Sequence, residues 1–281
     1  FSNNVPIIWL LYKLYDFGWN VAGSASRADF IWIQFQCMQF SLAAFFSSMT
    51  VLVISRKCFP AVLTMVVGVL FLGLSPWEII PYTDGSSILF PILVLFLYAC
   101  FRRISKGYRY VFWLAVAFLG ALGGIMKATV YVALIAVILM EILSVVIVRP
   151  QNIKTVFLWL ALLTLGMGGA FWCRSSMYRT VRYEPDPRWE ATWSNYFYMG
   201  LNEDDTGGSN GDGYELIHEC YPMSKAERQK IEIHMAWERM KEKGVGGTIN
   251  FFFRKLTMTY NDGTFSWFQE GLFYLWDYED M

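Results

Sequence analysis

Charged residues are scarce in this sequence. They make up 16% of its 281 residues, and acidic and basic side chains balance to a net charge of zero. Without a basic excess a nucleic-acid partner is not expected, because proteins bind nucleic acids largely through Lys and Arg at the phosphates. Metal ligands are few as well: His218 and His234 fall in different local contexts, and the five cysteines have no paired spacing. These absences argue against a zinc site and against a disulfide framework.

Hydrophobic residues, by contrast, make up 56% of the chain and gather in long blocks. A membrane-crossing helix needs about 20 mostly apolar residues to cover the hydrocarbon core of a bilayer. The composition therefore predicts an all-α polytopic membrane protein in contact with the lipid bilayer. We expect six transmembrane helices, at residues 30–55, 59–78, 86–101, 110–126, 128–148 and 155–173.

The short connections between these spans predict the orientation, because Lys and Arg are retained on the cytoplasmic side. Alternate connections hold eight basic residues, namely Arg56, Lys57, Arg102, Arg103, Lys106, Arg109, Arg149 and Lys154. The segments on the opposite side hold only Lys13, Arg27 and Lys127. We therefore expect a multi-pass protein of the cell membrane whose C-terminal region is extracytoplasmic.

Two domains are expected. Residues 1–173 form the transmembrane domain, and residues 174–281 form an extracytoplasmic, mainly helical region that holds 18 of the 23 acidic residues. The aromatic stretch at 5–19 is too short and too polar to span. It is typical of an interfacial helix on the outer surface, although an ordinary buried helix would also fit.

The C-terminal region contains one well-marked helix. Ser224 followed by Glu227 is the pattern of a capping box, and Gly244 is expected to end the helix that begins there. A second helix is expected in "TINFFFRKLTMTY".

The loop "GLNEDDTGGSNGDGYE" concentrates acidic residues among glycines: Glu203, Asp204, Asp205, Asp212 and Glu215. Flexible, oxygen-rich loops bind calcium. However, the spacing does not match an EF-hand, and acidic segments of this kind are usually only solvated. A divalent cation stays an open alternative, and no other cofactor is expected.

The stretch "PYTDGSS" at 81–87 places Asp84 at the outer end of a helix pair, and "GGIMKATVY" places Lys127 where the fourth span meets the fifth, on the same outer face. Ionisable residues at membrane depth are costly, so they indicate function by default. Two structural alternatives remain: an ordinary turn around Asp84, and a lysine that only reaches the lipid headgroups. Together the two residues suit a site for an anionic amphiphile such as a lipid phosphate.

Two further polar features lie inside the expected spans. Glu141 lies about 10 Å from the cytoplasmic end of its helix, where it either has a function or only pairs with a basic residue of a connecting loop. Three glutamines gather near the outer end of the first span and either line a polar cavity or hold helices together: Gln34, Gln36 and Gln39.

The order of these motifs resembles the membrane glycosyltransferases of the GT-C superfamily, which depend on polyprenyl-phosphate sugars and are related to protein mannosyltransferases and aminoarabinose transferases. The motifs are "NN" before an interfacial helix, "PYTD" at an outer helix junction and "GGIMKAT" at the next. The sequences "YMGLN", "GDGYE" and "FFFRKLTMTYNDGTFSW" resemble the outer region of a Gram-positive branch of that group. The resemblance implies transfer of a sugar, usually with inversion, from a polyprenyl-phosphate-linked donor to a glycan, lipid or protein acceptor on the extracytoplasmic face.

The resemblance also implies residue roles. Asn3, Asn4 and Tyr82 would bind substrate, and Lys127 would neutralise the phosphate of the donor. Asp84 would be catalytic, by orienting the acceptor or a basic partner.

The general base of this family is a carboxylate in the first outer loop, which would precede Phe1. We therefore expect a longer protein with at least one further span upstream. A transporter or flippase for a lipid-linked substrate is an alternative, although the two groups of three spans show no inverted repeat. A non-catalytic membrane subunit of a cell-envelope glycan assembly is another.

Overall fold

The computed structural model describes residues 5–23, 28–73, 82–104, 106–145, 153–182, 184, 186, 188–203, 206, 212–220 and 223–260. Within these ranges the chain is almost entirely helical, and no strand occurs. The chain divides into two compact units, one from Asn3 to Tyr183 and one from Glu184 to Met281.

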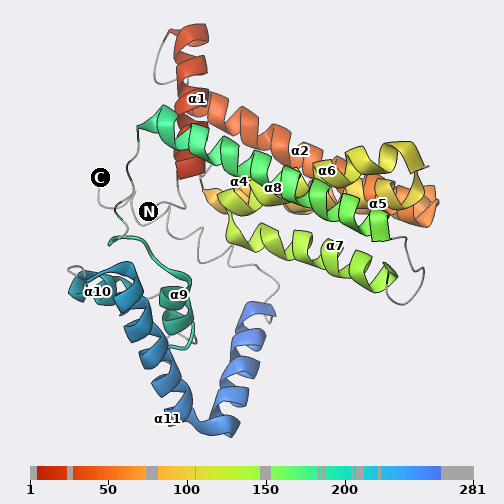
Figure 1. Cartoon of the computed structure of the whole chain (residues 1–281). Helices are drawn as coiled ribbons and strands as arrows, with labels where there is room; N and C mark the ends of the chain where they lie inside the picture. The colour runs from red at the N-terminus through yellow and green to blue at the C-terminus, as the bar shows by residue number, and fades with distance from the viewer. Residues whose placement is uncertain are drawn as a thin grey trace. The chain divides into compact units, whose positions relative to one another are not determined.

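The first unit is a bundle of apolar helices (Figure 1). Its elements are α1 (Val5–Ala22), α2 (Ala28–Ser55), α3 (Cys58–Leu72), α4 (Thr83–Ser87), α5 (Leu89–Arg103), α6 (Lys106–Met126), the 3-10 helix η4 (Ala128–Val130), α7 (Tyr131–Leu143) and α8 (Ile153–Val181). Helix α2 packs against α3 and α5, while α6 packs against α5 and α8. Large side chains from α5 to α8 form the core between the helices: Val94, Phe101, Trp113, Val116, Leu134, Val137 and Trp159.

Four helical segments of this unit are long and apolar enough to cross a membrane: Phe30–Ser55, Thr83–Arg103, Gly107–Met126 and Lys154–Val181. Two further apolar helices, Cys58–Leu72 and Ala128–Leu143, are shorter than a full span. The described residues therefore support four of the six expected spans. The expected ends of the other two, at 78 and 148, lie outside the described residues.

The third expected span begins earlier than the sequence suggested. The residues Thr83–Ser87 form a helical turn, and Ile88 keeps helical angles (φ −58°, ψ −33°), so that α4 leads directly into α5. Two serine hydroxyls stabilise this turn: that of Ser86 donates to the carbonyl of Tyr82 at 2.9 Å, and that of Ser87 to the carbonyl of Asp84 at 3.2 Å. The segment after Tyr82 is thus the first turn of a helix that is long and apolar enough to cross a membrane, and not a loop.

Helix α1 covers the expected interfacial segment at 5–19. It packs against α2 and α8 and runs across their direction (Figure 1). Val5 and Ile7 are buried, whereas Ile8, Tyr12 and Trp19 are exposed. These three side chains share one face, because their spacing is close to whole helical turns.

The second unit contains α9 (Trp193–Met199), α10 (Asp212–Glu219) and α11 (Lys225–Tyr260). Its core is formed by Tyr198, Leu201, Leu216, Cys220, Ala236 and Phe251. The two units divide between residues 183 and 184, and α8 continues as one helix to Val181. The boundary at 173 between a transmembrane and an extracytoplasmic region stays a prediction.

The expected helix start in this unit is confirmed. The backbone N–H of Ser224 donates to Oε2 of Glu227 at 3.0 Å, and the N–H of Glu227 donates to the hydroxyl of Ser224 at 3.4 Å. Hydrogen bonds from Ser224 hold the pKa of Glu227 below its usual value.

Gly244 has a positive φ of 64° and bends α11 into two arms, which form the V seen in Figure 1. The second arm contains the expected helix in "TINFFFRKLTMTY".

Candidate functional site

Asp84 and Lys127 form an ion pair, although they lie 43 residues apart in the sequence. The Nζ of Lys127 is 2.7 Å from Oδ2 of Asp84, and it lies 5.2 Å from the centre of the Tyr82 ring. The side chains of Asp84 and Lys127 are 51% and 27% exposed. A carboxylate, an ammonium and a phenol ring thus meet at an accessible place, where α4 begins and α6 ends. We call these three residues the Asp84–Lys127 site.

The backbone at Lys127 places its side chain in this site. Helix α6 ends at Met126, and Lys127 is extended (φ −144°, ψ 119°) before the chain enters η4. The N–H of Lys127 donates to the carbonyl of Gly123 at 2.8 Å, and its carbonyl accepts from the N–H of Val130 at 3.0 Å. The break is therefore held on both sides by backbone hydrogen bonds.

Two glycines let the neighbouring helices approach this break. A Cβ atom on Gly123 would lie 2.5 Å from Cβ of Phe90 in α5, and one on Gly124 would lie 2.5 Å from ring atoms of Tyr131 in α7. Real Cβ atoms do not approach other heavy atoms so closely, so larger residues here would push α6 away from its neighbours. The glycines of "GGIMKAT" thus set the spacing on which the contact between Lys127 and Asp84 depends.

The arrangement is suited to holding an anion. An ammonium group has three donors, and one of them is directed at Asp84. Because the pair is exposed, its own attraction is weak, so an anionic phosphate can compete with the carboxylate. Asp84 then holds the lysine in place from one side, while the face of Tyr82 attracts the ammonium from another.

Two other site predictions fall partly or wholly outside the described residues. Asn3 and Asn4 lie outside them, as do Asp204 and Asp205 of the acidic loop. Glu203 of that loop pairs with Lys243 at 2.9 Å and with Arg254. Within the described ranges no group of three His, Cys, Asp or Glu side chains is placed to hold a metal ion.

A second polar cluster lies at the opposite end of α5. Oε1 of Glu141 accepts hydrogen bonds from the hydroxyl of Tyr98 and from Nη1 of Arg102, both at 2.8 Å. Nη1 of Arg102 also donates to the hydroxyl of Ser144 at 3.0 Å. Glu141 is only 3% exposed, so the structure shows the pairing alternative that the sequence left open. Tyr98 was not predicted, although its spacing of four residues from Arg102 places both on one helix face.

Only two of the three glutamines near the N-terminal end of α2 are joined by a hydrogen bond. Gln34 is exposed, whereas Gln36 and Gln39 are buried. Nε2 of Gln39 donates to Oε1 of Gln36 at 3.3 Å. This bond lies within one helix, so it does not itself link two helices.

The second unit contains a buried pair of opposite charges. Arg228 and Glu232 are 1% and 0% exposed, one turn apart on α11. Oε2 of Glu232 accepts from the hydroxyls of Thr192 and Ser194, both at 2.5 Å. The guanidinium of Arg228 donates to the backbone carbonyls of Arg188 and Glu190. These bonds fix the segment before α9 onto α11, which is a structural role.

One comparison with known proteins gives a family. A family model described as a conserved hypothetical integral membrane protein matches residues 1–279. Comparison with curated proteins and with solved structures gave no match. The match extends over both units, and it agrees with the long apolar helices of the first unit. The chain therefore belongs to this family of integral membrane proteins.

Proposed function

We propose that this protein is a GT-C-type membrane glycosyltransferase that moves a sugar from a polyprenyl-phosphate-linked donor to an acceptor on the extracytoplasmic face. The proposal starts from the motifs that resemble that superfamily. The observation that supports it best is the contact between Lys127 and Asp84 at 2.7 Å, because the "PYTD" and "GGIMKAT" motifs meet in one accessible site.

The proposed orientation follows from the charges at the two ends of α5 and α6. Their connection at the far end carries Arg102, Arg103, Lys106 and Arg109. By the retention of basic loops in the cytoplasm, the end with Asp84 and Lys127 faces outward. In this orientation α1 lies along the outer lipid surface with Ile8, Tyr12 and Trp19 among the headgroups, and the chain crosses the membrane several times.

The proposed reaction assigns a separate task to each charged group. The acceptor oxygen forms a bond to C1 of the sugar while the bond from C1 to the phosphate oxygen breaks, and the electron pair leaves with the lipid phosphate. Lys127 stabilises the negative charge that grows on that phosphate. Asp84 orients the lysine and the acceptor, and the acceptor proton passes to a general base, which the resemblance implies is a carboxylate.

The full protein in lipid nanodiscs, supplied with a panel of polyprenyl-phosphate monosaccharides and candidate acceptors, tests the proposal. We expect acceptor-dependent release of polyprenyl phosphate, and a drop in rate of at least about 100-fold in Asp84→Asn and Lys127→Met, the size typical for loss of one electrostatic catalytic group. Lys13→Met, which removes an exposed lysine of α1, is the matched control and should leave the rate unchanged.

Each contrary result points to another function. Full activity of Asp84→Asn would remove Asp84 from the site. Movement of a labelled polyprenyl-phosphate sugar across a vesicle membrane, without release of the sugar, would favour a flippase. Neither release nor movement in the presence of the whole panel would favour a non-catalytic subunit.

A further inference from the structure

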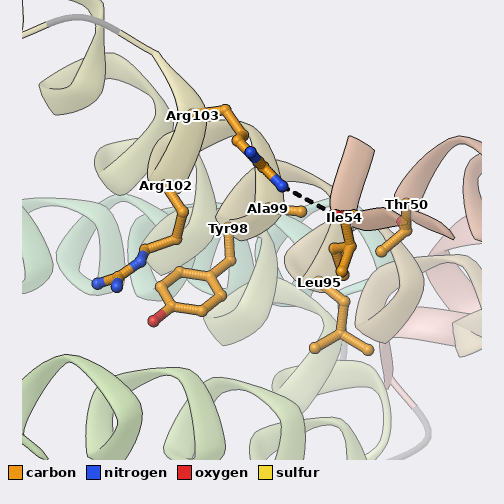
Figure 2. A pocket seen from close by; sticks show the side chains of 7 residues that line it. All are labelled: Thr50, Ile54, Leu95, Tyr98, Ala99, Arg102 and Arg103. Carbon is orange, nitrogen blue, oxygen red and sulfur yellow. Dashed lines mark hydrogen bonds between the residues drawn. The ribbon is translucent and has the colours of Figure 1, made fainter. Parts of the chain in front are cut away.

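A cavity of about 460 Å³ lies between α2 and α5, at the end of the bundle that carries the basic connections. Its lining comes from two turns of α2 and from one face of α5: Thr50, Ile54, Leu95, Tyr98, Ala99, Arg102 and Arg103 (Figure 2). The proposed reaction does not use this cavity, because α4 and α5 together form a segment of 21 residues, so Asp84 and Arg103 are separated by about 30 Å of helix.

The lining is cationic at one end and apolar at the other. Figure 2 shows the side chain of Arg103 reaching toward Ile54, and Leu95 lying away from both guanidinium groups. Leu95 is 46% exposed and Ile54 is 60% exposed, on helices whose outer surfaces are apolar. The cavity is therefore open toward the position of lipid chains, with its positive charge at the level of the headgroups.

Both guanidinium groups are held in place by protein acceptors. Nη2 of Arg103 donates to the carbonyl of Ile54 at 2.8 Å, near the C-terminal end of α2. Nη1 of Arg102 is bonded to Glu141 and Ser144. A guanidinium has five N–H donors, so each group keeps donors beyond those used in these bonds. Such fixed, fork-shaped donors match the oxygens of a phosphate.

The charge around the cavity favours an anion. Glu141 is the only acidic residue in the sequence between Asp84 and Glu184, and it lies against Arg102. The guanidinium of Arg103 is not paired with an acid among the described residues. The cavity thus carries a net positive charge beside an apolar surface, which is the arrangement that binds anionic headgroups between transmembrane helices.

We propose that this cavity binds the phosphate of an anionic lipid, with the lipid tail lying along Leu95 and Ile54 between α2 and α5. The phosphate contacts Arg103, and it comes from the leaflet on the basic side of the membrane. This site is separate from the Asp84–Lys127 site, and it is a binding site without a reaction step.

Native mass spectrometry of the full chain in a neutral detergent tests the proposal, because it gives a dissociation constant for each bound lipid. The probes are phosphatidylglycerol, polyprenyl phosphate and phosphatidylcholine, with inorganic phosphate as a competitor. We expect one molecule of phosphatidylglycerol to bind at least about tenfold more tightly than phosphatidylcholine, as charge-assisted hydrogen bonds to a phosphate would give. Polyprenyl phosphate should bind here as well as at the Asp84–Lys127 site. Arg103→Gln should remove the preference for phosphatidylglycerol.

Two further variants separate binding from folding and from general charge. Leu95→Trp fills the apolar end and leaves both arginines, so it should weaken the binding of phosphatidylglycerol. Lys57→Gln removes an exposed charge at the same end that does not line the cavity, and it should change nothing. Asp84→Asn should also leave this binding intact, so a failure here is distinguishable from a failure of the proposed transferase.

The proposal is overturned if wild type and Arg103→Gln bind phosphatidylglycerol equally. It is also overturned if inorganic phosphate displaces the lipid at equal concentration, because the site would then recognise free phosphate without a tail.

Discussion

The sequence limits the ion-pair partners of Glu141 to a few basic residues, but it does not say which of them pairs. Any basic residue of the connection between α5 and α6 could form this ion pair, and the packing of α5 on α7 decides which one does. The structure selects Arg102, whose Nη1 lies 2.8 Å from the carboxylate, while Arg103 is directed to the end of α2. A charge in an apolar helix therefore predicts an ion pair, but the packing of the helices decides which one forms.

The two partners should respond unequally to substitution. Glu141 is 4% exposed in its side chain and Arg102 is 45% exposed. Arg102→Gln leaves a buried carboxylate without its cation, which we expect to cost about 3 kcal/mol of unfolding free energy. Glu141→Gln leaves an arginine that water can reach, so we expect a cost of about 1 kcal/mol. Unfolding of the full chain in mixed micelles, followed by tryptophan fluorescence, measures both.

The double variant Arg102→Gln with Glu141→Gln is the control for this comparison. Removing both charges should recover part of the stability that Arg102→Gln alone loses, because no buried charge remains. Equal losses in the two single variants would show that burial of Glu141 is not what makes the pair important.

At the scale of elements, the close contact of α6 with α7 depends on a glycine. A Cβ on Gly124 would meet the ring of Tyr131 at 2.5 Å, whereas a Cβ on Gly168 of α8 would meet nothing within 4 Å. We expect Gly124→Ala to destabilise the protein by about 1–3 kcal/mol through overpacking. Gly168→Ala should be neutral or stabilise the protein by up to about 1 kcal/mol, because alanine favours the helix. Thermal unfolding in detergent compares the two variants.

Gly124→Ala should also affect the site. Displacement of the end of α6 moves Lys127 away from Asp84, so we expect a fall in polyprenyl phosphate release that Gly168→Ala does not show. If Gly124→Ala lowers the stability but leaves the release rate normal, then the packing of α6 against α7 does not control the proposed reaction.

The bend of α11 offers a similar comparison within one helix. A Cβ meets nothing within 4 Å at either Gly244 or Gly246, but only Gly244 has a positive φ. Gly244→Ala should therefore cost about 1–3 kcal/mol, because an L-residue is strained at this combination of positive φ and extended ψ. Gly246→Ala should stabilise its arm by about 1 kcal/mol. Hydrogen exchange along α11 measures both effects, and equal protection in the two variants would contradict the assignment of strain to φ.

Local sequence signals predicted element ends well where one side chain decides them. The capping box at Ser224 and the break at Gly244 are such cases. The helical turn α4 was less predictable, because "TDGSS" has the composition of a turn, yet its serines bond back to the preceding carbonyls and the helix continues into α5. The length of α8 was missed since its last residues are polar, and a helix can leave the apolar layer without ending.

At the scale of the whole molecule, the apolar blocks and the basic loops predicted that Asp84 and Lys127 lie at one end of a helical unit. The 2.7 Å contact agrees with that prediction, while the roles of the two residues stay predictions. The buried bonds of Glu232 to Thr192 and Ser194 could not be predicted. They join segments about 40 residues apart, and no periodic pattern marks such a pairing.

The orientation of the molecule underlies both proposals, and it can be measured with single cysteines in a chain freed of its native ones: Cys37, Cys58, Cys100, Cys173 and Cys220. Three exposed positions are suitable, namely Thr129 beside the Asp84–Lys127 site, Lys230 in the second unit and Lys57 at the basic end. In intact cells a membrane-impermeant maleimide should label Thr129→Cys and Lys230→Cys, because the retention of basic loops places both outside.

Lys57→Cys should react with this maleimide only after the cells are permeabilised. Labelling of Lys57→Cys in intact cells, with Thr129→Cys protected, would show that the orientation in the membrane is the opposite of the proposed one. The Asp84–Lys127 site would then face the cytoplasm, and a donor presented on the outer face could not reach Lys127. Labelling of Thr129→Cys without Lys230→Cys would instead place the two units on opposite sides, which requires an odd number of crossings between them. The proposed transferase requires only that Thr129, beside the Asp84–Lys127 site, is outside. This result would therefore change the side assigned to the second unit and leave the proposed site unchanged.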